Sequence, residues 1–271
     1  MDKEVMDKVM TEVMKRLGDA TGAAPAAAVE AAPAASSNAA RFDNIGVTEF
    51  VGTAMGHTIG MVIANVDPAL HQAMGIDPRY RSIGIISDRV GAGPQIMATD
   101  EAVKATNTEV LSVELPRDTE GGAGHGCLIT VGAEDVSDAR RAVEVALANV
   151  ETFFGDVWGN EVGYLELQYT ARASYAVNKA LGGPLGKAYG LVLGAPAGIG
   201  VVICDTAVKA AEVEVLSYAS PSKTSFTNEA FINITGDSGA VRQAIRAARE
   251  VGVKLLAQLG SEPKSGSTPY I

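Results

Sequence analysis

A thirteen-residue segment occurs twice in this chain, and this repeat constrains the fold more than any other feature of the sequence. Residues 100–112 return at residues 205–217 with nine of thirteen positions identical and a constant offset of 105. Self-similarity of this kind indicates a duplicated structural unit. Because 271 residues are enough for two domains of ordinary size, the repeat predicts two similar domains in tandem.

Each copy is predicted to be a β-α-β-β-α unit. Short apolar runs predict strands at 83–86, 109–115 and 127–131 in the first copy, and at 189–192, 214–218 and 230–234 in the second. An additional strand-and-helix block, 48–75 and 164–181, precedes each unit. The expected fold class is therefore α/β, with an antiparallel sheet of about four strands and helices on one face in each domain.

A long helix is expected to end each unit. Asp135 and Asp237 stand where they could cap these helices. Apolar residues at helical spacing predict the buried stripes, which are Val136, Val143, Leu147, Val150 and Phe154 in the first helix and Val241, Ile245, Ala248, Val251 and Leu255 in the second.

The N-terminal segment differs in composition from the rest. Residues 2–17 predict an amphipathic helix whose apolar face carries Val5, Met6, Val9, Met10, Val13 and Leu17. The Ala-, Pro- and Ser-rich residues that follow predict a linker. The helix could fold back on its own domain or dock on a partner, and the reach of the linker favours docking. The predicted organisation is helix 1–18, linker 19–44, domains 45–157 and 158–260, and tail 261–271.

Composition excludes several classes of protein. The net charge of −10 argues against nucleic-acid binding, which needs a dense basic face. Two cysteines far apart in the sequence indicate neither a disulfide framework nor a paired metal site, and so favour a reducing cytoplasm. Residues 188–204 are uncharged and apolar, but their five glycines and prolines and their short length argue against a membrane span.

Several motifs resemble the shell proteins of bacterial microcompartments. The repeated Asp-x-Ala-Val-Lys-Ala, followed by Glu-Val-Leu-Ser, is similar to a helix end and strand of that family, and the block before each unit resembles its circularly permuted version. Supporting stretches are 48–54, 63–67, 79–84, 121–126, 169–175 and 236–242. The resemblance runs from about residue 45 to the end, and residues 1–40 resemble an extension found in the tandem members.

The resemblance implies a homotrimer of two-domain chains that imitates a hexamer and tiles with other shell proteins around a cytoplasmic compartment. Six wedge-shaped units about one axis agree with the closed symmetry usual in oligomers. The resemblance also implies that the N-terminal helix anchors the enclosed enzymes. Which pathway the compartment houses stays open among propanediol, glycerol, ethanolamine and ethanol utilisation.

The same resemblance implies two sets of site residues. Lys104 and Lys209 would lie on the tile edge, with Asn107 beside the first and Glu212 where the second copy should carry asparagine. Loops facing a pore for small hydroxylated metabolites would contain Gly122, Gly124 and His125 in one copy, and Ser222, Lys223, Thr224 and Ser225 in the other. An opening within each subunit is an alternative position for the pore.

The residues themselves suggest little catalytic chemistry. The Gly-rich loop 121–126 could belong to a small-molecule-binding α/β enzyme, but it lacks the Gly-Lys-Ser/Thr ending of a phosphate loop. The histidines at 57, 71 and 125 lack metal-ligand spacing. Cys127 is expected to be a buried strand residue. The alternative, which the resemblance to tandem shell proteins implies, is an iron–sulfur site on a threefold axis. No catalytic residue, metal or cofactor is therefore predicted.

Overall fold

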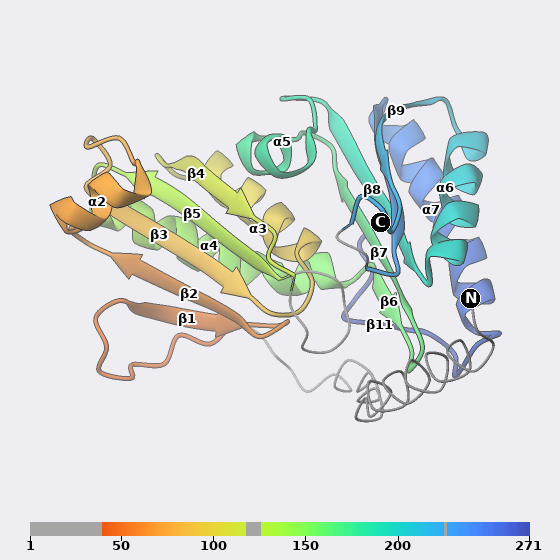
Figure 1. Cartoon of the computed structure of the whole chain (residues 1–271), viewed down its shortest axis with the longest axis horizontal. Coiled ribbons are helices and arrows are strands. Elements are labelled where there is room, and N and C mark those ends of the chain that lie inside the picture. Colours follow the sequence, from red (N-terminus) through yellow and green to blue (C-terminus); the bar gives the residue numbers. More distant parts are fainter. Residues whose placement is uncertain (1–39, 118–125, 225–226) are drawn as a thin grey trace, which may run out of the picture.

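Two antiparallel sheets, each with its own pair of long helices, make up the part of the chain that the computed structural model describes, which is residues 40–117, 126–224 and 227–271 (Figure 1). The predicted N-terminal helix and linker to residue 39 lie outside the described residues.

The first domain contains a five-stranded sheet in the order β1-β2-β3-β5-β4. The helices α3 and α4 pack side by side, and α4 crosses β1, β2, β3 and β5. The elements are β1 (Phe50–Ala54), β2 (Thr58–Ile63), α2 (Pro68–Met74), β3 (Ser82–Asp88), α3 (Gly93–Lys104), β4 (Glu109–Glu114), β5 (Cys127–Ala133) and α4 (Val136–Phe154).

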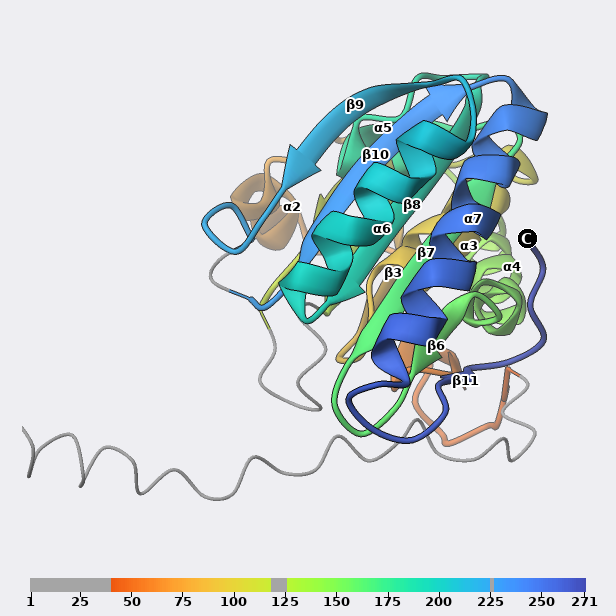
Figure 2. The ribbon, with the colours of Figure 1, turned by 90° about the vertical axis from the view of Figure 1, so that its right-hand side faces the viewer.

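The second domain repeats this arrangement in a six-stranded sheet with the order β11-β6-β7-β8-β10-β9. The helices α6 and α7 cover one face of this sheet (Figure 2). The elements are β6 (Val157–Gly159), β7 (Tyr164–Thr170), α5 (Tyr175–Leu181), β8 (Ala188–Ala195), α6 (Ala197–Ala210), β9 (Val213–Ala219), β10 (Ala230–Gly236), α7 (Ser238–Leu256) and β11 (Lys264–Ser265).

The predicted fold class is confirmed, and the structure adds edge strands to both sheets. The block at 48–75 holds two strands instead of one, because Gly56 and His57 have φ angles of 74° and 53° and turn the chain into a hairpin. Residues 264 and 265, inside the predicted tail, form β11 and pair with β6. Residues 188–204 form β8 and the first half of α6, and no helix in the described part of the chain is long and apolar enough to cross a membrane.

Three details of the long helices differ from the prediction. Asp135 and Asp237 occupy the N-cap positions of α4 and α7, but neither side chain makes a capping hydrogen bond. Val136 is 40% exposed, because it begins α4 beyond the edge of the core. The remaining residues of the first stripe are buried. In the second stripe Val251 and Leu255 are only partly buried, and Leu256 is buried instead of Leu255.

A glycine in the middle of β3 and another in β8 bring each sheet close to its long helix. A Cβ atom on Gly84 would lie 2.8 Å from a methyl group of Val143 in α4, and one on Gly190 would lie 2.8 Å from Val241 in α7. These are the glycines of the two matching apolar runs, so the repeat reflects equivalent helix-to-sheet packing in the two domains.

The C-terminal residues tie the two domains together. The Tyr270 ring packs edge-on against Phe153 at the end of α4, with ring centroids 5.2 Å apart. The Tyr270 and Ile271 N–H groups donate to Oδ2 of the buried Asp156, at 2.8 and 2.9 Å. Arg249 of α7 donates to Oδ1 of the same carboxylate at 2.5 Å. Asp156 therefore joins the chain end, α7 and the connection between the domains.

Candidate functional site at the seam between the domains

The two domains meet along a seam formed by α3 and β4 of the first domain and by α5, β7 and β8 of the second. The helix α3 lies between the two sheets, so the second sheet is covered by its own helices on one face and by α3 on the other (Figure 1). Residues Tyr189, Leu191 and Leu193 of β8 consequently belong to the same buried cluster as Ile96 and Met97 of α3.

At one end of the seam, Asp100 of α3 binds the N-terminus of α5. Its carboxylate accepts the Ser174 N–H at 2.9 and 3.0 Å and the Val177 N–H at 3.1 Å. Burial raises the pKa of Asp100, and these N–H groups and Lys104 oppose that shift. An acid at a helix N-terminus satisfies free N–H groups, so this contact fixes α5 against the first domain.

The predicted edge lysines have different surroundings. Lys104 lies beside this contact, where its Nζ is 3.0 Å from Asp100 and 2.7 Å from Glu101, and its side chain is 24% exposed. Lys209 pairs with Asp205 at 2.6 Å, and its side chain is 74% exposed. Asn107 is exposed. Lys104 thus lies at the seam, whereas Lys209 lies on an open surface.

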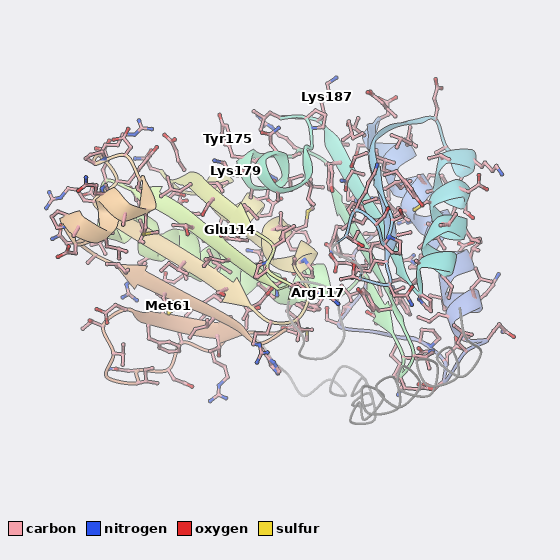
Figure 3. The ribbon with its side chains drawn as sticks, viewed as in Figure 1. Met61, Glu114, Arg117, Tyr175, Lys179 and Lys187 are labelled. Atoms are coloured by element: carbon pink, nitrogen blue, oxygen red, sulfur yellow. The ribbon has the colours of Figure 1, made fainter. Side chains whose placement is uncertain are left out.

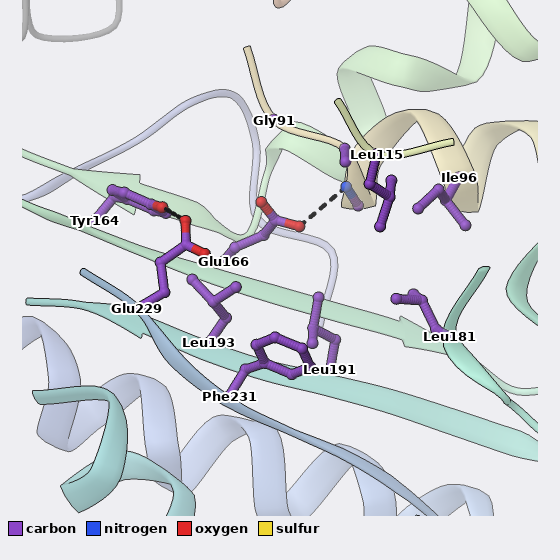
Figure 4. Close-up of a pocket in the computed structure, with 12 residues that line it drawn as sticks. Gly91, Ile96, Leu115, Tyr164, Glu166, Leu181, Leu191, Leu193, Glu229 and Phe231 are labelled. Carbon is purple, nitrogen blue, oxygen red and sulfur yellow. Dashed lines mark hydrogen bonds between the residues drawn. The ribbon is translucent and has the colours of Figure 1, made fainter. Parts of the chain in front are cut away.

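At the other end of the seam lies a cavity of about 70 Å³ between the start of α3 and the second sheet (Figure 4). Its apolar wall includes Ile96, Leu115, Leu191, Leu193 and Phe231. Its polar wall is formed by Tyr164, Glu166 and Glu229 of the second domain. A cavity of this size could hold about two water molecules.

The two carboxyl groups of the cavity have different partners. Glu229 accepts hydrogen bonds from the Tyr164 hydroxyl and from Thr227 Oγ1. Glu166 accepts one bond at Oε1, from the Gly93 N–H of α3 at 3.1 Å. Burial and then the charge of Glu229 raise the pKa of Glu166 to about 7, and the Gly93 N–H opposes them. A Cβ at residue 93 would lie 1.9 Å from Glu166 Oε1, so only glycine allows this contact.

The predicted pore loops are only partly described. Gly122, Gly124, His125 and Ser225 lie outside the described residues. Ser222 and Lys223 are exposed in the turn after β9. Thr224 is 5% exposed and bonds to the carbonyl groups of Ser220 and Thr227, so its side chain holds the turn together.

The other candidate residues have structural surroundings. Cys127 is fully buried at the start of β5, and burial, followed by the charge of Asp88, raises the pKa of its thiol. The His71 ring bonds to the Tyr80 carbonyl at 2.9 Å. No cluster of three metal-ligating side chains occurs among the residues the structure describes.

Sequence reasoning missed the acids of the seam. Glu166 was detectable in principle, because a carboxylate within the apolar strand Tyr164–Thr170 stands out. Asp100 lies inside the repeat, yet its partner α5 is 74 residues away. Only the three-dimensional arrangement brings these groups to a common boundary.

Comparison with known proteins agrees with the duplicated architecture. A family profile described as "BMC domain" matches residues 82–163 and 188–261, once in each half of the chain. The chain belongs to the family of bacterial microcompartment shell proteins. Both matches leave out the block of strands and short helix that precedes each unit, as a permuted domain order requires.

Individual shell proteins are similar over nearly the whole chain. The microcompartment shell protein PduB of Salmonella typhimurium is 57% identical over 269 residues, which cover 99% of this chain and 98% of that protein. A crystal structure of a trimeric PduB shares 56% identity and a TM-score of 0.80, covering 83% of this chain and all of that one. EtuB from Clostridium kluyveri gives the same identity and TM-score and covers 83% and 99%. The tandem shell-protein resemblance is thus confirmed, and the enzyme alternative is wrong, because these shell proteins are structural.

Proposed function

We propose that three copies of this shell protein close into a pseudo-hexameric tile, in which each seam between copies repeats the seam within a chain. The observation that carries this proposal is a pattern of exposure. Apolar residues that are buried at the seam in one half of the chain have counterparts in the other half that are exposed.

The helix α6 shows this pattern on the second domain. Ile96 of α3 is 1% exposed in the seam, whereas Val201, at the same offset of 105 in α6, is 48% exposed. Met97 and its counterpart Val202 are 0% and 46% exposed. The face of α6 that would meet another sheet is therefore apolar and uncovered, as an interface requires.

The first domain carries the complementary surface. Leu128 pairs with Ser87, which lies three residues after Gly84 in β3. Phe231 pairs with Leu193, which lies three residues after Gly190 in β8. Leu128 and Phe231 are therefore counterparts. Phe231 lines the seam cavity, whereas Leu128 is 36% exposed. Met61 lies on the same open face of the first sheet (Figure 3). This face is apolar, and no helix of the described residues covers it, so it suits α6 of a second copy.

The short helices extend the same correspondence. Both α2 and α5 are seven residues long and end at a left-handed glycine, Gly75 or Gly182. Val177 of α5 is buried against the first domain, whereas the equivalent Leu70 of α2 is 45% exposed. Lys179 of α5 donates to the Leu111 carbonyl of β4 at 3.0 Å (Figure 3). We propose that α2 contacts β9 of the next copy in the same way, near the exposed Val215 and Tyr218.

The proposed tile belongs to the shell of a cytoplasmic microcompartment and meets other shell proteins at its edges. Lys104, Asn107 and Lys209 are proposed edge residues, and Glu212 makes the two edge types unequal. The loops 121–126 and 222–225 are proposed to face a pore for small hydroxylated metabolites.

Negative-stain microscopy of the purified full chain tests the tile. Three-lobed hexagonal discs, or sheets and tubes built from them, are expected because six similar domains surround one axis. A field of compact single chains or dimers at micromolar concentration would contradict the proposal.

The N-terminal helix is proposed to anchor enclosed enzymes through its apolar stripe, Val5 to Leu17. Deleting residues 1–40 should leave the discs intact, because the described domains form both faces of the proposed interface without them. The enzymes enclosed with the shell should then be lost when compartments are purified and their protein content is measured. Unchanged enzyme content would refute the anchoring role, and loss of the discs would assign the segment to assembly.

A further inference from the structure

Glu166 occupies a place where a charge is poorly tolerated and where the two domains touch. It projects from β7 of the second domain, and its Oε1 accepts the Gly93 N–H at the start of α3 across the seam. This is the one hydrogen bond that the described structure gives to the Glu166 carboxyl group. Its second oxygen faces the cavity, beside Glu229 (Figure 4).

The neighbouring groups offer little compensation for a negative charge on Glu166. Among the described residues that line the cavity there is no lysine, arginine or histidine. The strand β8 carries no charged residue, and the first charged side chain of α3 is Asp100, at the far end of the seam. The ionisable groups that interact with Glu166 are Glu229, Tyr164, Tyr189 and, from the C-terminal segment, Tyr270.

The carboxyl group of Glu229 has more hydrogen-bond donors around it than that of Glu166. It accepts two hydrogen bonds, from Tyr164 and Thr227, whereas Glu166 accepts one. Two neighbouring carboxylates in an apolar site cannot both ionise easily, so one of them keeps a proton. A negative charge on Glu166 is therefore disfavoured by its burial and by Glu229.

The first domain lacks this pair at the equivalent positions. Val62 pairs with Gly84 in the first domain, and Tyr169 pairs with Gly190 in the second, so Val62 and Tyr169 are counterparts. Three residues before them lie Ile59 and Glu166, which are therefore counterparts as well. The same register makes Gly126 the counterpart of Glu229. The seam within the chain is therefore acidic, and a seam built on the first domain's open face would be apolar.

We infer that Glu166 makes the seam within each chain a proton-sensitive closure, which is tight while Glu166 holds its proton and loosens as that proton is lost. This goes beyond tile formation and does not depend on it, because every group involved belongs to one chain.

The direction of the pH dependence follows from the folded and opened states. In the closed seam Glu166 titrates with a pKa of about 7, and in an opened, hydrated seam it should return toward the usual 4.5. The contribution of Glu166 to the free energy of closing the seam is complete below about pH 4.5. That contribution is lost as the pH rises through about 7. Between those values each pH unit should favour opening by up to about tenfold.

Hydrogen exchange of the intact chain, read by mass spectrometry between pH 5 and 8, tests this inference. After correction for intrinsic exchange rates, peptides covering 91–98 and 164–168 should lose up to about 100-fold in protection from pH 5 to pH 7 and then level off. In Glu166→Gln, a neutral side chain of the same shape, this loss should disappear. Glu114→Gln, an exposed acid at the end of β4, should behave like the wild type.

Two results would overturn the inference. One is constant seam protection in the wild type over this range, and the other is an unchanged pH dependence in Glu166→Gln. If the Glu166→Gln variant folds poorly, Glu166→Ile provides a second variant, because isoleucine is the residue at the equivalent position 59 of the first domain. It should likewise remove the pH dependence, and a retained dependence would count against Glu166.

Discussion

Replacing Asp156 with alanine is expected to destabilise the chain by about 3–5 kcal/mol, because it leaves Arg249 partly buried without its carboxylate. The loss also removes the acceptor for the Tyr270 and Ile271 N–H groups. For a protein of this size the change corresponds to a fall in Tm of roughly 10 °C. Chemical denaturation of the purified variant gives the free energy directly.

Two companion variants separate the role of Asp156 from general effects of losing an acid. Asp135→Ala removes an exposed aspartate that makes no capping bond, and it should change stability by no more than about 0.5 kcal/mol. Deleting residues 270–271 removes the donors instead of the acceptor. Combined with Asp156→Ala, the deletion should cost less than the sum of the separate effects, because the two changes break the same contact. Full additivity, or an Asp156→Ala variant as stable as wild type, would refute the proposed role of the C-terminal contact.

Replacing Val201 with aspartate is expected to abolish the trimer. Val201 is exposed on the isolated chain, but its counterpart Ile96 is buried in the seam and lines its cavity. In the proposed tile the new carboxylate would be buried against the apolar face that carries Leu128 of the next copy. A cost of about 3 kcal/mol at each seam weakens association there more than roughly 100-fold.

The control for this change is another exposed valine that the seams should not include. Val136 is 40% exposed at the start of α4, where an acid interacts favourably with the helix dipole. Val136→Asp should therefore keep both the fold and the trimer. Circular dichroism of both variants should match that of the wild type, which separates loss of assembly from loss of folding.

The repeat at 100–112 and 205–217 predicts most of the fold, because its strands and helices are local features with clear apolar patterns. The hairpin at Gly56 was missed, since its Met-Gly-His loop lacks the Asn-Gly or Asp-Gly pair that marks a hairpin in a sequence. The seam was missed for a different reason. Asp100, Glu166 and Asp156 bind partners far away in the sequence, and an acid in a strand or helix gives no local sign of which N–H it will meet.

The copies are most informative where they differ. Glu166 and Ile59 occupy equivalent positions, and so do Ile96 and Val201, yet each pair differs in chemistry or in exposure. A duplicated chain can therefore make its internal seam acidic and its external seam apolar, which a ring of six identical domains could not do.

The assembly of three copies through seams of the internal type can be tested by native mass spectrometry. The wild type and the Val201→Asp and Val136→Asp variants are compared at equal micromolar concentration. We expect three copies for the wild type, one for Val201→Asp and three for Val136→Asp. A folded Val201→Asp variant that still assembles as three copies would contradict the claim that the seam between copies repeats the seam within a chain.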